Sequence, residues 1–203
     1  MIVAIKYPNG QPYHDSTHQP LSKKAADSKP VQHGHRGMSL EQELNRANEF
    51  YLQRGIANIH KKPTPIQIVH VDYPKRAAAK ITEAYFQQAS TTDYNGIYQG
   101  HYLDFDAKET NSPTAFPLNN LHQHQVTHLL DTKRLGGISF LIIRFTKYQE
   151  TYCVPIDAIN QFWERRKTER QSIPYQAIVQ HGVLIQPSLY PSLPYLEAVD
   201  HII

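Results

Sequence analysis

The first amphipathic stretch of the chain follows residue 38 and has helical spacing. Its apolar positions lie three or four residues apart, as they do on one face of an α-helix: Leu40, Leu44, Ala47 and Tyr51. Ser39, with Gln42 three residues further on, forms a capping-box pattern ahead of them. Gly55 supplies a stop signal. The pattern predicts a helix that begins at Ser39 and ends near Gly55.

Strand-like and helical segments alternate along the rest of the chain. The predicted strands are short runs rich in Ile, Val, Tyr and Phe: 56–60, 66–73, two within 91–108, 138–146 and 151–156. A helix is predicted from residue 120 to about residue 135, where Gly136-Gly137 ends it, and an amphipathic helix from about residue 157. Between residue 108 and Pro117 the composition favours a loop. This order of elements predicts an α/β fold, a mixed sheet flanked by helices.

Residues 91–108, T-T-D-Y-N-G-I-Y-Q-G-H-Y-L-D-F-D-A-K, read as two strands with two candidate turns between them. Asn95-Gly96 is by itself the stronger type I′ turn signal. A turn there would carry the acidic residues of the two strands far apart. A turn at Gln99-Gly100 brings the charged residues together on one face. We favour the later turn for that reason.

With the later turn, residues that face each other have numbers that sum to 199. Asp93 then faces Asp106, and Thr91 faces Lys108, all on the same side of the hairpin. Opposed Cβ atoms in such a pair lie roughly 4.5–5.5 Å apart. Two carboxylates at that distance repel each other unless a cation lies between them, and Mg²⁺ fits the gap. With Lys108 adjacent, the set has the parts needed to hydrolyse a phosphodiester. A solvated hairpin with scattered charges is the alternative.

Several short sequence motifs give the chain a resemblance to a known family. In chain order they are Y-P-N-G, G-M-S-L-E, H-K-K-P-T-P, Y-P-K-R, A-Y-F, T-T-D-Y-N-G and F-D-A-K-E-T. In these motifs the chain resembles the RecU Holliday-junction resolvases. The spacing D-x(12)-D-x-K is also similar to the signature of restriction-endonuclease-like nucleases. The likeness runs from the first residues to the C-terminus and is weaker in the final third. The chain departs from the family at Asp106, where the family usually has Glu, which bears on ligand reach and metal preference.

The resemblance implies a restriction-endonuclease-like fold and a structure-selective endonuclease. Such an enzyme resolves four-way (Holliday) junctions by symmetric phosphodiester hydrolysis in DNA recombination and repair. It would depend on Mg²⁺, with Mn²⁺ as a substitute. Asp93 and Asp106 would hold the metal, Thr91 would help complete the site, and Lys108 would stabilise the charge of the transition state. The near two-fold symmetry of a junction favours a homodimer, with recombination proteins as further partners.

Two polar residues on predicted helices also match metal-site positions of related nucleases. Gln125 shares an inward stripe with apolar residues four positions before and after it, and a buried amide must find hydrogen-bond partners. The family carries a metal-site Gln at this spacing from its first Asp. Glu41 matches a first-helix Glu that can approach the metal, although its place in the first turn also suits the helix dipole. A zinc site at the nearby histidines is disfavoured because the motif has no acidic or thiol partner.

The residues predicted to contact DNA lie on loops, on a predicted stalk and on an N-terminal arm. In the resembling family the stretch that matches residues 77–92 contributes to a stalk that enters the junction, where Phe86 would stack on bases. Residues 1–37, rich in Pro, Ser, His and Lys, are predicted to be a mobile basic arm ahead of a nuclease domain at 38–203. The cations predicted to contact phosphates are Arg36, Lys61, Lys62, Lys75 and Arg76.

The composition limits the possible functions but does not by itself identify DNA as the binding partner. The 203 residues carry a net charge of +3, which is a modest pointer to a polyanion. The single cysteine, Cys153, excludes an internal disulfide and a cysteine-based zinc site, and a buried small side chain is its favoured identity. The first apolar run is too short for a signal peptide, and no segment of the sequence is long enough to span a bilayer. These features favour a cytoplasmic protein without membrane contact.

Two rival functions remain open from the sequence. A restriction-like or repair endonuclease would use the same metal site on other DNA structures. A noncatalytic protein that bridges DNA or assists a recombinase would keep the fold without the reaction. The replacement of Glu by Asp106 favours that second rival, whereas Asp93 and Lys108 favour an enzyme.

Overall fold

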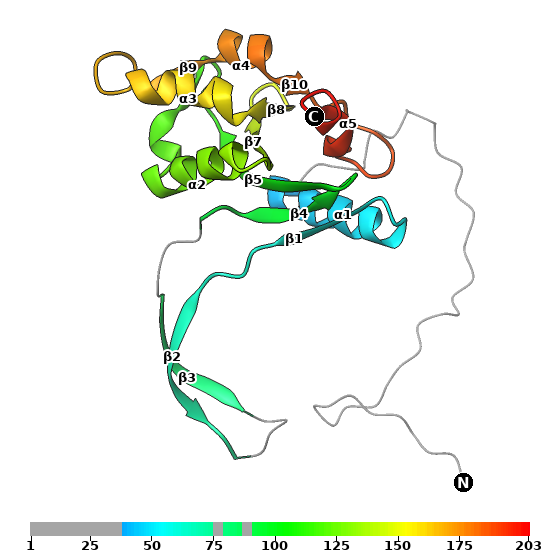
Figure 1. Cartoon of the computed structure of the whole chain (residues 1–203), viewed down its shortest axis with the longest axis vertical. Coiled ribbons are helices and arrows are strands. Elements are labelled where there is room, and N and C mark those ends of the chain that lie inside the picture. The colour runs from blue at the N-terminus through cyan, green and yellow to red at the C-terminus, as the bar shows by residue number, and fades with distance from the viewer. Residues whose placement is uncertain (1–37, 75–78, 87–90) are drawn as a thin grey trace, which may run out of the picture. The chain divides into compact units, whose positions relative to one another are not determined.

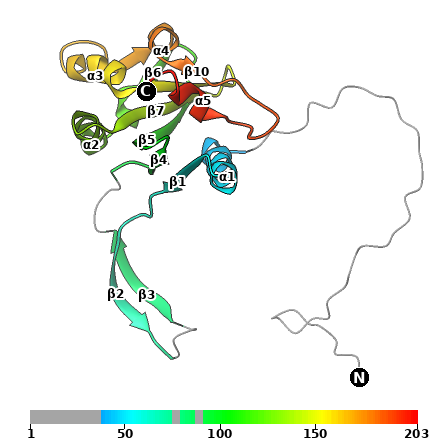
Figure 2. The same cartoon turned by 45° about the vertical axis from the view of Figure 1, so that its right-hand side comes forward.

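A mixed β-sheet forms the centre of the protein in a computed structural model that describes residues 38–74, 79–86 and 91–203. Within these residues, six strands lie in the order β1-β4-β5-β7-β8-β10, and Figure 2 shows β1, β4, β5 and β7 in succession. Only β5 and β7 pair in parallel; the other neighbours in this sheet are antiparallel. The strands are β1 (Ala57–Lys61), β4 (Tyr94–Tyr98), β5 (His101–Thr110), β7 (Ile138–Phe145), β8 (Glu150–Pro155) and β10 (Val183–Leu184).

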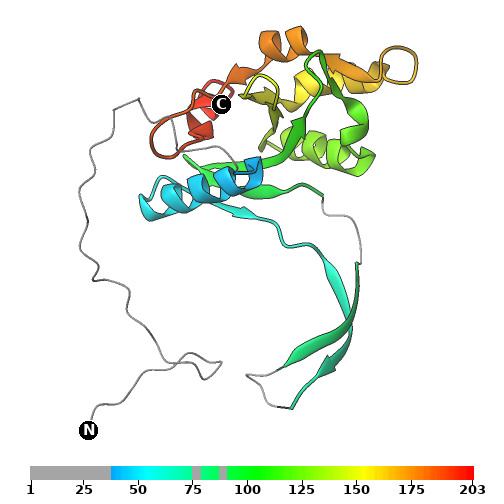
Figure 3. The same cartoon turned by 180° about the vertical axis from the view of Figure 1, so that it is seen from behind.

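Helices cover both faces of this sheet. The helices are α1 (Leu40–Gln53), α2 (Gln123–Arg134), α3 (Ile156–Arg165), α4 (Tyr175–His181) and α5 (Tyr195–Val199), with a 3₁₀ turn at Leu118–Asn120 (Figure 1). Helices α1 and α5 pack on the face that presents Phe105 and Phe140, and Figure 3 shows α1 in front of the strands. Helices α2, α3 and α4 pack on the face that presents Leu141 and Ile143. The structure confirms the predicted α/β architecture, a mixed sheet between helices.

Within the described part of the chain, four further strands pair outside the large sheet. β2 (Ile66–Asp72) pairs antiparallel with β3 (Lys80–Phe86), and β6 (Ala115–Pro117) with β9 (Ser172–Pro174). The pair β2–β3 exposes large apolar side chains, among them Ile68, Val69 and Tyr85, the last with 61% of its surface accessible. Two-stranded sheets are marginal without a packing partner. Within the predicted stalk at residues 77–92, β3 occupies Lys80–Phe86, and its pairing with β2 is an addition to that prediction.

The hairpin β4–β5 has the predicted register. Tyr94 pairs with Phe105 and Tyr98 with His101, so the numbers of paired residues sum to 199. Gln99 and Gly100 form the turn, both with positive φ, at 49° and 80°. Positive φ at both central residues is what a type I′ turn requires. The alternative turn at residues 95 and 96 is excluded.

Gly96, the glycine of the rejected turn, lies where strands β1 and β4 approach each other closely. It pairs with Ile59 of β1, and a Cβ built on Gly96 would lie 2.1 Å from the carbonyl oxygen of Asn58. No side chain fits there unless the backbone of β1 moves. A glycine that reads as a turn signal is therefore required in a strand for a steric reason.

We expect Gly96→Ala to lower the free energy of unfolding by about 1–3 kcal/mol, the usual cost of overpacking a filled site. The measurement is urea-induced unfolding followed by circular dichroism. Gly55→Ala is a suitable comparison, because a Cβ there has no neighbour within 4 Å and the cost is limited to a φ of +65°. An equal or smaller loss at Gly96 would show that β1 yields to the added methyl group.

Two predicted boundaries are wrong, and each has a local cause. The second predicted helix begins at Gln123 because a 3₁₀ turn occupies Leu118–Asn120, where the sequence suggested a helix start. The predicted loop after residue 108 begins later, since β5 continues to Thr110 alongside β7, and β6 forms within the remainder. The first helix has its predicted capping box at Ser39 and Gln42.

Several predictions fall outside the described residues. They concern the arm at residues 1–37 with Arg36, and the basic pair Lys75 and Arg76. The side chain of Phe86 at the end of β3 is likewise not described. Cys153, by contrast, is buried in β8, as predicted, and burial raises the pKa of its thiol. Among the described helices, none is long and apolar enough to cross a membrane.

Candidate active site

Asp106 is a buried carboxylate on the central strand β5. Its side chain is fully inaccessible to solvent, and its Oδ2 lies 2.6 Å from Nζ of Lys108, two residues further along the same strand. Oδ1 of Asp106 has no hydrogen-bond partner within the part of the chain that is described. A buried ionised carboxylate is costly unless its oxygens are satisfied. The environment therefore leaves a place for a further cation.

The pKa of Asp106 reports the same shortage of positive charge. Burial, and then the neighbouring carboxyl group of Asp93, raise this pKa to about 7, against the lowering effect of the Lys108 ammonium. Two neighbouring carboxyl groups resist simultaneous ionisation, so the protonated form of Asp106 is favoured below about pH 7. Lys108 alone does not compensate for both carboxylates.

Asp93 reaches the site from the segment just before β4. Its Oδ2 accepts a hydrogen bond from the backbone N–H of Ala107 at 3.3 Å, which places the carboxylate against β5 at Ala107. The strand β4 begins only at Tyr94, so the expected pairs Asp93–Asp106 and Thr91–Lys108 lie just beyond the ladder. Asp93 is nevertheless close enough to Asp106 for its carboxyl group to raise the pKa of Asp106.

A cavity of about 280 Å³ opens beside these residues. Asp93 and Lys108 line it, together with Glu41 from the first turn of α1 and Glu109 from β5. Glu41 also forms an ion pair with Lys61 at the end of β1. The structure thus brings Glu41 to the same cavity as Asp93 and Lys108, residues that are more than fifty positions away from it in the sequence.

The residues at this cavity fit a divalent cation bound through oxygen. Asp93 and Asp106 supply adjacent carboxylates, one with an oxygen that has no hydrogen-bond donor among the described residues. Glu41 lines the same cavity as Asp93, but the described residues contain no group of three acidic, histidine or cysteine side chains close enough together to hold a metal. Small hard cations prefer such oxygen ligands. A bound cation would also favour the ionised form of Asp106, against the burial and the neighbouring Asp93 that raise its pKa.

We expect binding of Mg²⁺ or Mn²⁺ to weaken by up to about tenfold per pH unit below pH 7. The pKa of Asp106 is raised to about 7, so a proton occupies this carboxyl group below that pH and the cation must displace it. Above pH 7 the affinity should level off. Calorimetric titration between pH 5.5 and 8.5 measures this, and a flat profile below pH 7 would contradict it. Asp106→Asn should lose the slope together with most of the affinity.

Gln125 and Thr91 occupy different surroundings. Gln125 is buried near the start of α2, and its Oε1 accepts a hydrogen bond from the backbone N–H of His122 at 3.1 Å. It lies three residues before His128, which contacts β5, so both side chains belong to the helix face that covers the sheet. Thr91 is exposed, and its Oγ1 accepts a hydrogen bond from Lys62 at 3.4 Å. Their roles at a metal stay predictions.

The predicted phosphate contacts Lys61 and Lys62 are both engaged within the protein. Lys61 pairs with Glu41, and both side chains are about half exposed. Lys62 is largely buried, and its Nζ lies 2.8 Å from Oδ2 of Asp104. A phosphate contact by Lys62 would require this ammonium to leave a buried carboxylate.

A cluster around Asp104 was not foreseen from the sequence. This carboxylate is fully buried, and Lys62, Thr92, Tyr102 and His128 all form hydrogen bonds or ion pairs with it. We call these five residues the Asp104 cluster. The signal that could have revealed it is the period-two spacing of strands, because Asp104 lies on the same face as Asp106.

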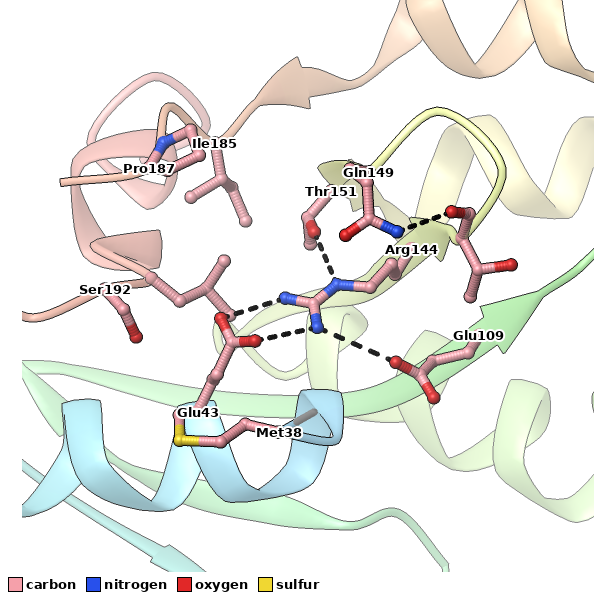
Figure 4. A pocket seen from close by; sticks show the side chains of 11 residues that line it. Met38, Glu43, Glu109, Arg144, Gln149, Thr151, Ile185, Pro187 and Ser192 are labelled. Carbon is pink, nitrogen blue, oxygen red and sulfur yellow. Dashed lines mark hydrogen bonds and ion pairs between the residues drawn. The ribbon is translucent and has the colours of Figure 1, made fainter. Parts of the chain in front are cut away.

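A larger cavity, of about 640 Å³, lies on the other side of Glu109 (Figure 4). Arg144 of β7 occupies its floor and donates two hydrogen bonds to Glu43 of α1, at 3.0 and 3.1 Å, and one to Thr151. Glu109 lies 3.7 Å from the same guanidinium group and accepts a hydrogen bond from the backbone N–H of Leu40. Its charged groups are paired with one another, so this cavity holds α1 against the sheet rather than offering free ligands.

Comparisons with known proteins agree on one family. A family model described as Recombination protein U (RecU) matches residues 35–201. The Holliday junction resolvase RecU of Latilactobacillus sakei is 52% identical over 99% of this chain and 97% of its own length. The proteins of the same description from Leuconostoc mesenteroides and Staphylococcus aureus are 52% and 49% identical, each over 98% of this chain and 97% and 96% of their own lengths.

Solved structures also match this chain. The Holliday junction resolvase Hjc of Archaeoglobus fulgidus matches 69% of this chain and 93% of its own, with a TM-score of 0.38 and 8% identity.

Proposed function

From the sequence family to which this chain belongs, Recombination protein U (RecU), we infer that it is an endonuclease that resolves Holliday junctions during recombination. Relatives about 50% identical over nearly the full chain carry this description. Junction resolvases of this kind depend on a divalent metal. We propose that the metal here is Mg²⁺, with Mn²⁺ as a substitute.

The single observation that carries the site assignment is the proximity of two carboxyl groups beside a cavity that Asp93 lines. Asp93 raises the pKa of buried Asp106, and an ammonium group lies 2.6 Å from that same carboxyl. Carboxylates at a cation beside a lysine are the chemical set that phosphodiester hydrolysis requires. We propose Asp93 and Asp106 as the metal ligands.

The proposed mechanism divides the work among these residues. Bound Mg²⁺ supplies activation of water and neutralisation of the scissile phosphate. Asp93, from the segment before β4, and Asp106, from β5, would hold the cation in a fixed position. Lys108 stabilises the negative charge that develops on the phosphate in the transition state. Glu41 approaches from α1, where it orients water or shares in binding the cation.

We further propose that DNA approaches from the side of Glu41, which lines the cavity, and of its ion-pair partner Lys61. The exposed apolar residues of β2 and β3, with Tyr85 among them, suit stacking on unpaired bases at the crossover. Lys75, Arg76 and Arg36 remain proposed phosphate contacts, as does Phe86 for stacking. Lys61 would exchange its pairing with Glu41 for a phosphate.

A two-fold homodimer is the simplest enzyme for a substrate with near two-fold symmetry and two symmetric cuts. We propose that the active species has this form. Light scattering of the protein with and without junction DNA measures the stoichiometry. One protomer per junction at saturation would contradict the proposal.

The test of the function compares cleavage of a labelled four-way junction with that of the same sequences as linear duplexes, in Mg²⁺. Paired, symmetric nicks in the junction, with the duplexes intact, are the expected result. Equal cleavage of both substrates would identify a general nuclease. Tight junction binding without cleavage in Mg²⁺ or Mn²⁺ would identify a noncatalytic bridging protein.

A further inference from the structure

The Asp104 cluster lies directly behind the proposed metal site and has no part in the chemistry described so far. Asp104 is two residues before Asp106 on β5, and Thr92 is one residue before Asp93. Lys62 joins the two. Its Nζ lies 2.8 Å from Oδ2 of Asp104 and donates a hydrogen bond to Oγ1 of Thr92. Thr92 in turn donates to the other oxygen of Asp104.

Lys62 also contacts the segment of Asp93 through its backbone. Its N–H donates to the carbonyl oxygen of Asp93 at 2.7 Å. One residue therefore fixes this segment twice, by its main chain at Asp93 and by its side chain at Thr92. Lys62 directly follows β1, where the chain leaves the large sheet toward β2, and Thr92 lies just before β4, where the chain re-enters the large sheet. Because both side chains contact Asp104, this carboxylate holds the two ends of the excursion together.

The remaining partners hold Asp104 from other elements. Nε2 of His128, on α2, lies 2.9 Å from Oδ2 of Asp104, and the hydroxyl of Tyr102 donates to the same oxygen at 3.0 Å. Asn95 of β4 donates to the oxygen of Tyr102 at 3.0 Å. Asp104 is fully buried, and only 16% of the Lys62 side chain is exposed. Such a pair is weakly screened by salt and has little freedom to rearrange.

We propose that Lys62 and Asp104 are positioning residues for the nuclease reaction: their buried ion pair sets where the Asp93 carboxylate stands relative to Asp106, and it ties that position to both connections of the β2–β3 pair. The proposal rests on the proposed metal site at Asp93 and Asp106. It gives Lys62 a role inside the protein, in place of the phosphate contact expected from its sequence. Neither residue touches the reacting atoms.

The first test is Lys62→Met, which keeps most of the side-chain length and removes the ammonium. We expect Mg²⁺ binding, measured by calorimetry without DNA, to weaken by about tenfold, because ligand atoms must be held in place for tight coordination. The junction dissociation constant, measured in a chelator, should change by less than about twofold. Lys133→Met is the matched control, because Lys133 forms an exposed ion pair with Asp157 and its loss removes the same charge.

The outcomes separate the alternatives. Weaker junction binding with a reduced salt dependence, and unchanged Mg²⁺ binding, would make Lys62 a phosphate contact and overturn the proposal. Unchanged values of both would also overturn it. The calorimetric measurement of Mg²⁺ binding needs no DNA, so its result is valid whether or not the protein cleaves junctions. Failure of the proposed function would be seen separately, in the cleavage assay with the wild-type protein.

Tyr102→Phe is a milder second variant, in case loss of the ammonium prevents folding. It removes one hydrogen bond to Asp104 and leaves the ion pair in place. We expect Mg²⁺ binding to weaken by about threefold, with junction binding unaltered. A Mg²⁺ affinity equal to that of the wild type in this variant would contradict a positioning role for the cluster.

Discussion

Replacing Asp93 by Asn is expected to lower the rate of junction cleavage by at least about a thousandfold. The change removes one of two adjacent carboxylates and leaves the shape of the side chain nearly the same. Metal ions contribute several kcal/mol to stabilising such transition states, and each 1.4 kcal/mol is a factor of ten in rate. Single-turnover cleavage of a labelled junction measures the effect.

Junction binding should survive in the Asp93→Asn variant. Loss of a negative charge beside the cavity does not weaken attraction to phosphate, so the dissociation constant measured in a chelator should be equal or slightly lower. Asp131→Asn is the matched control, because Asp131 is exposed on α2 and pairs with nearby Arg134. Cleavage within tenfold of wild type would remove Asp93 from the metal site.

Lys108→Met is expected to lower the rate of cleavage by about 10²–10³-fold, the usual loss when one group that stabilises transition-state charge is removed. Unlike a defect in metal binding, this loss should persist at saturating Mg²⁺. A second effect follows from electrostatics. Lys108 lowers the pKa of Asp106, so its removal should raise that pKa and shift the pH dependence of metal binding upward.

The two effects of Lys108→Met are measured separately. Single-turnover rates across a Mg²⁺ series give the first, and calorimetric metal titrations at several pH values give the second. Lys147→Met, on the exposed loop between β7 and β8, controls for the change in net charge. Full recovery of the rate at high Mg²⁺ would assign Lys108 to metal binding alone.

The sequence contained enough to place the carboxylates but not to describe their surroundings. The hairpin register followed from asking which turn unites the charges, and it was right although Asn95-Gly96 is the stronger local signal. That local signal failed because Gly96 is needed where β1 passes close by, a contact between segments that sequence spacing does not report. Tertiary packing overrode local turn chemistry.

The Asp104 cluster and the ion pair of Arg144 with Glu43 show a different limit. The residues of the ion pair are a hundred positions apart and lie on β7 and α1, and neither belongs to a local motif. Charged residues usually read as solvated faces, and nothing in a single sequence says which few are buried. The helix boundary near residue 120 failed for a smaller reason, because a 3₁₀ turn and a helix share the same start signals.

Arg144 has a consequence for how ionic strength should act on this enzyme. The guanidinium group and Glu43 are largely buried, with 13% and 9% of their side chains exposed, so dissolved ions screen this attraction weakly. Contacts between surface lysines and DNA phosphates are, in contrast, sensitive to dissolved ions. Added salt should therefore raise the KM for junction DNA while the kcat of the bound complex changes little, since the helix that carries Glu41 stays fixed to the sheet.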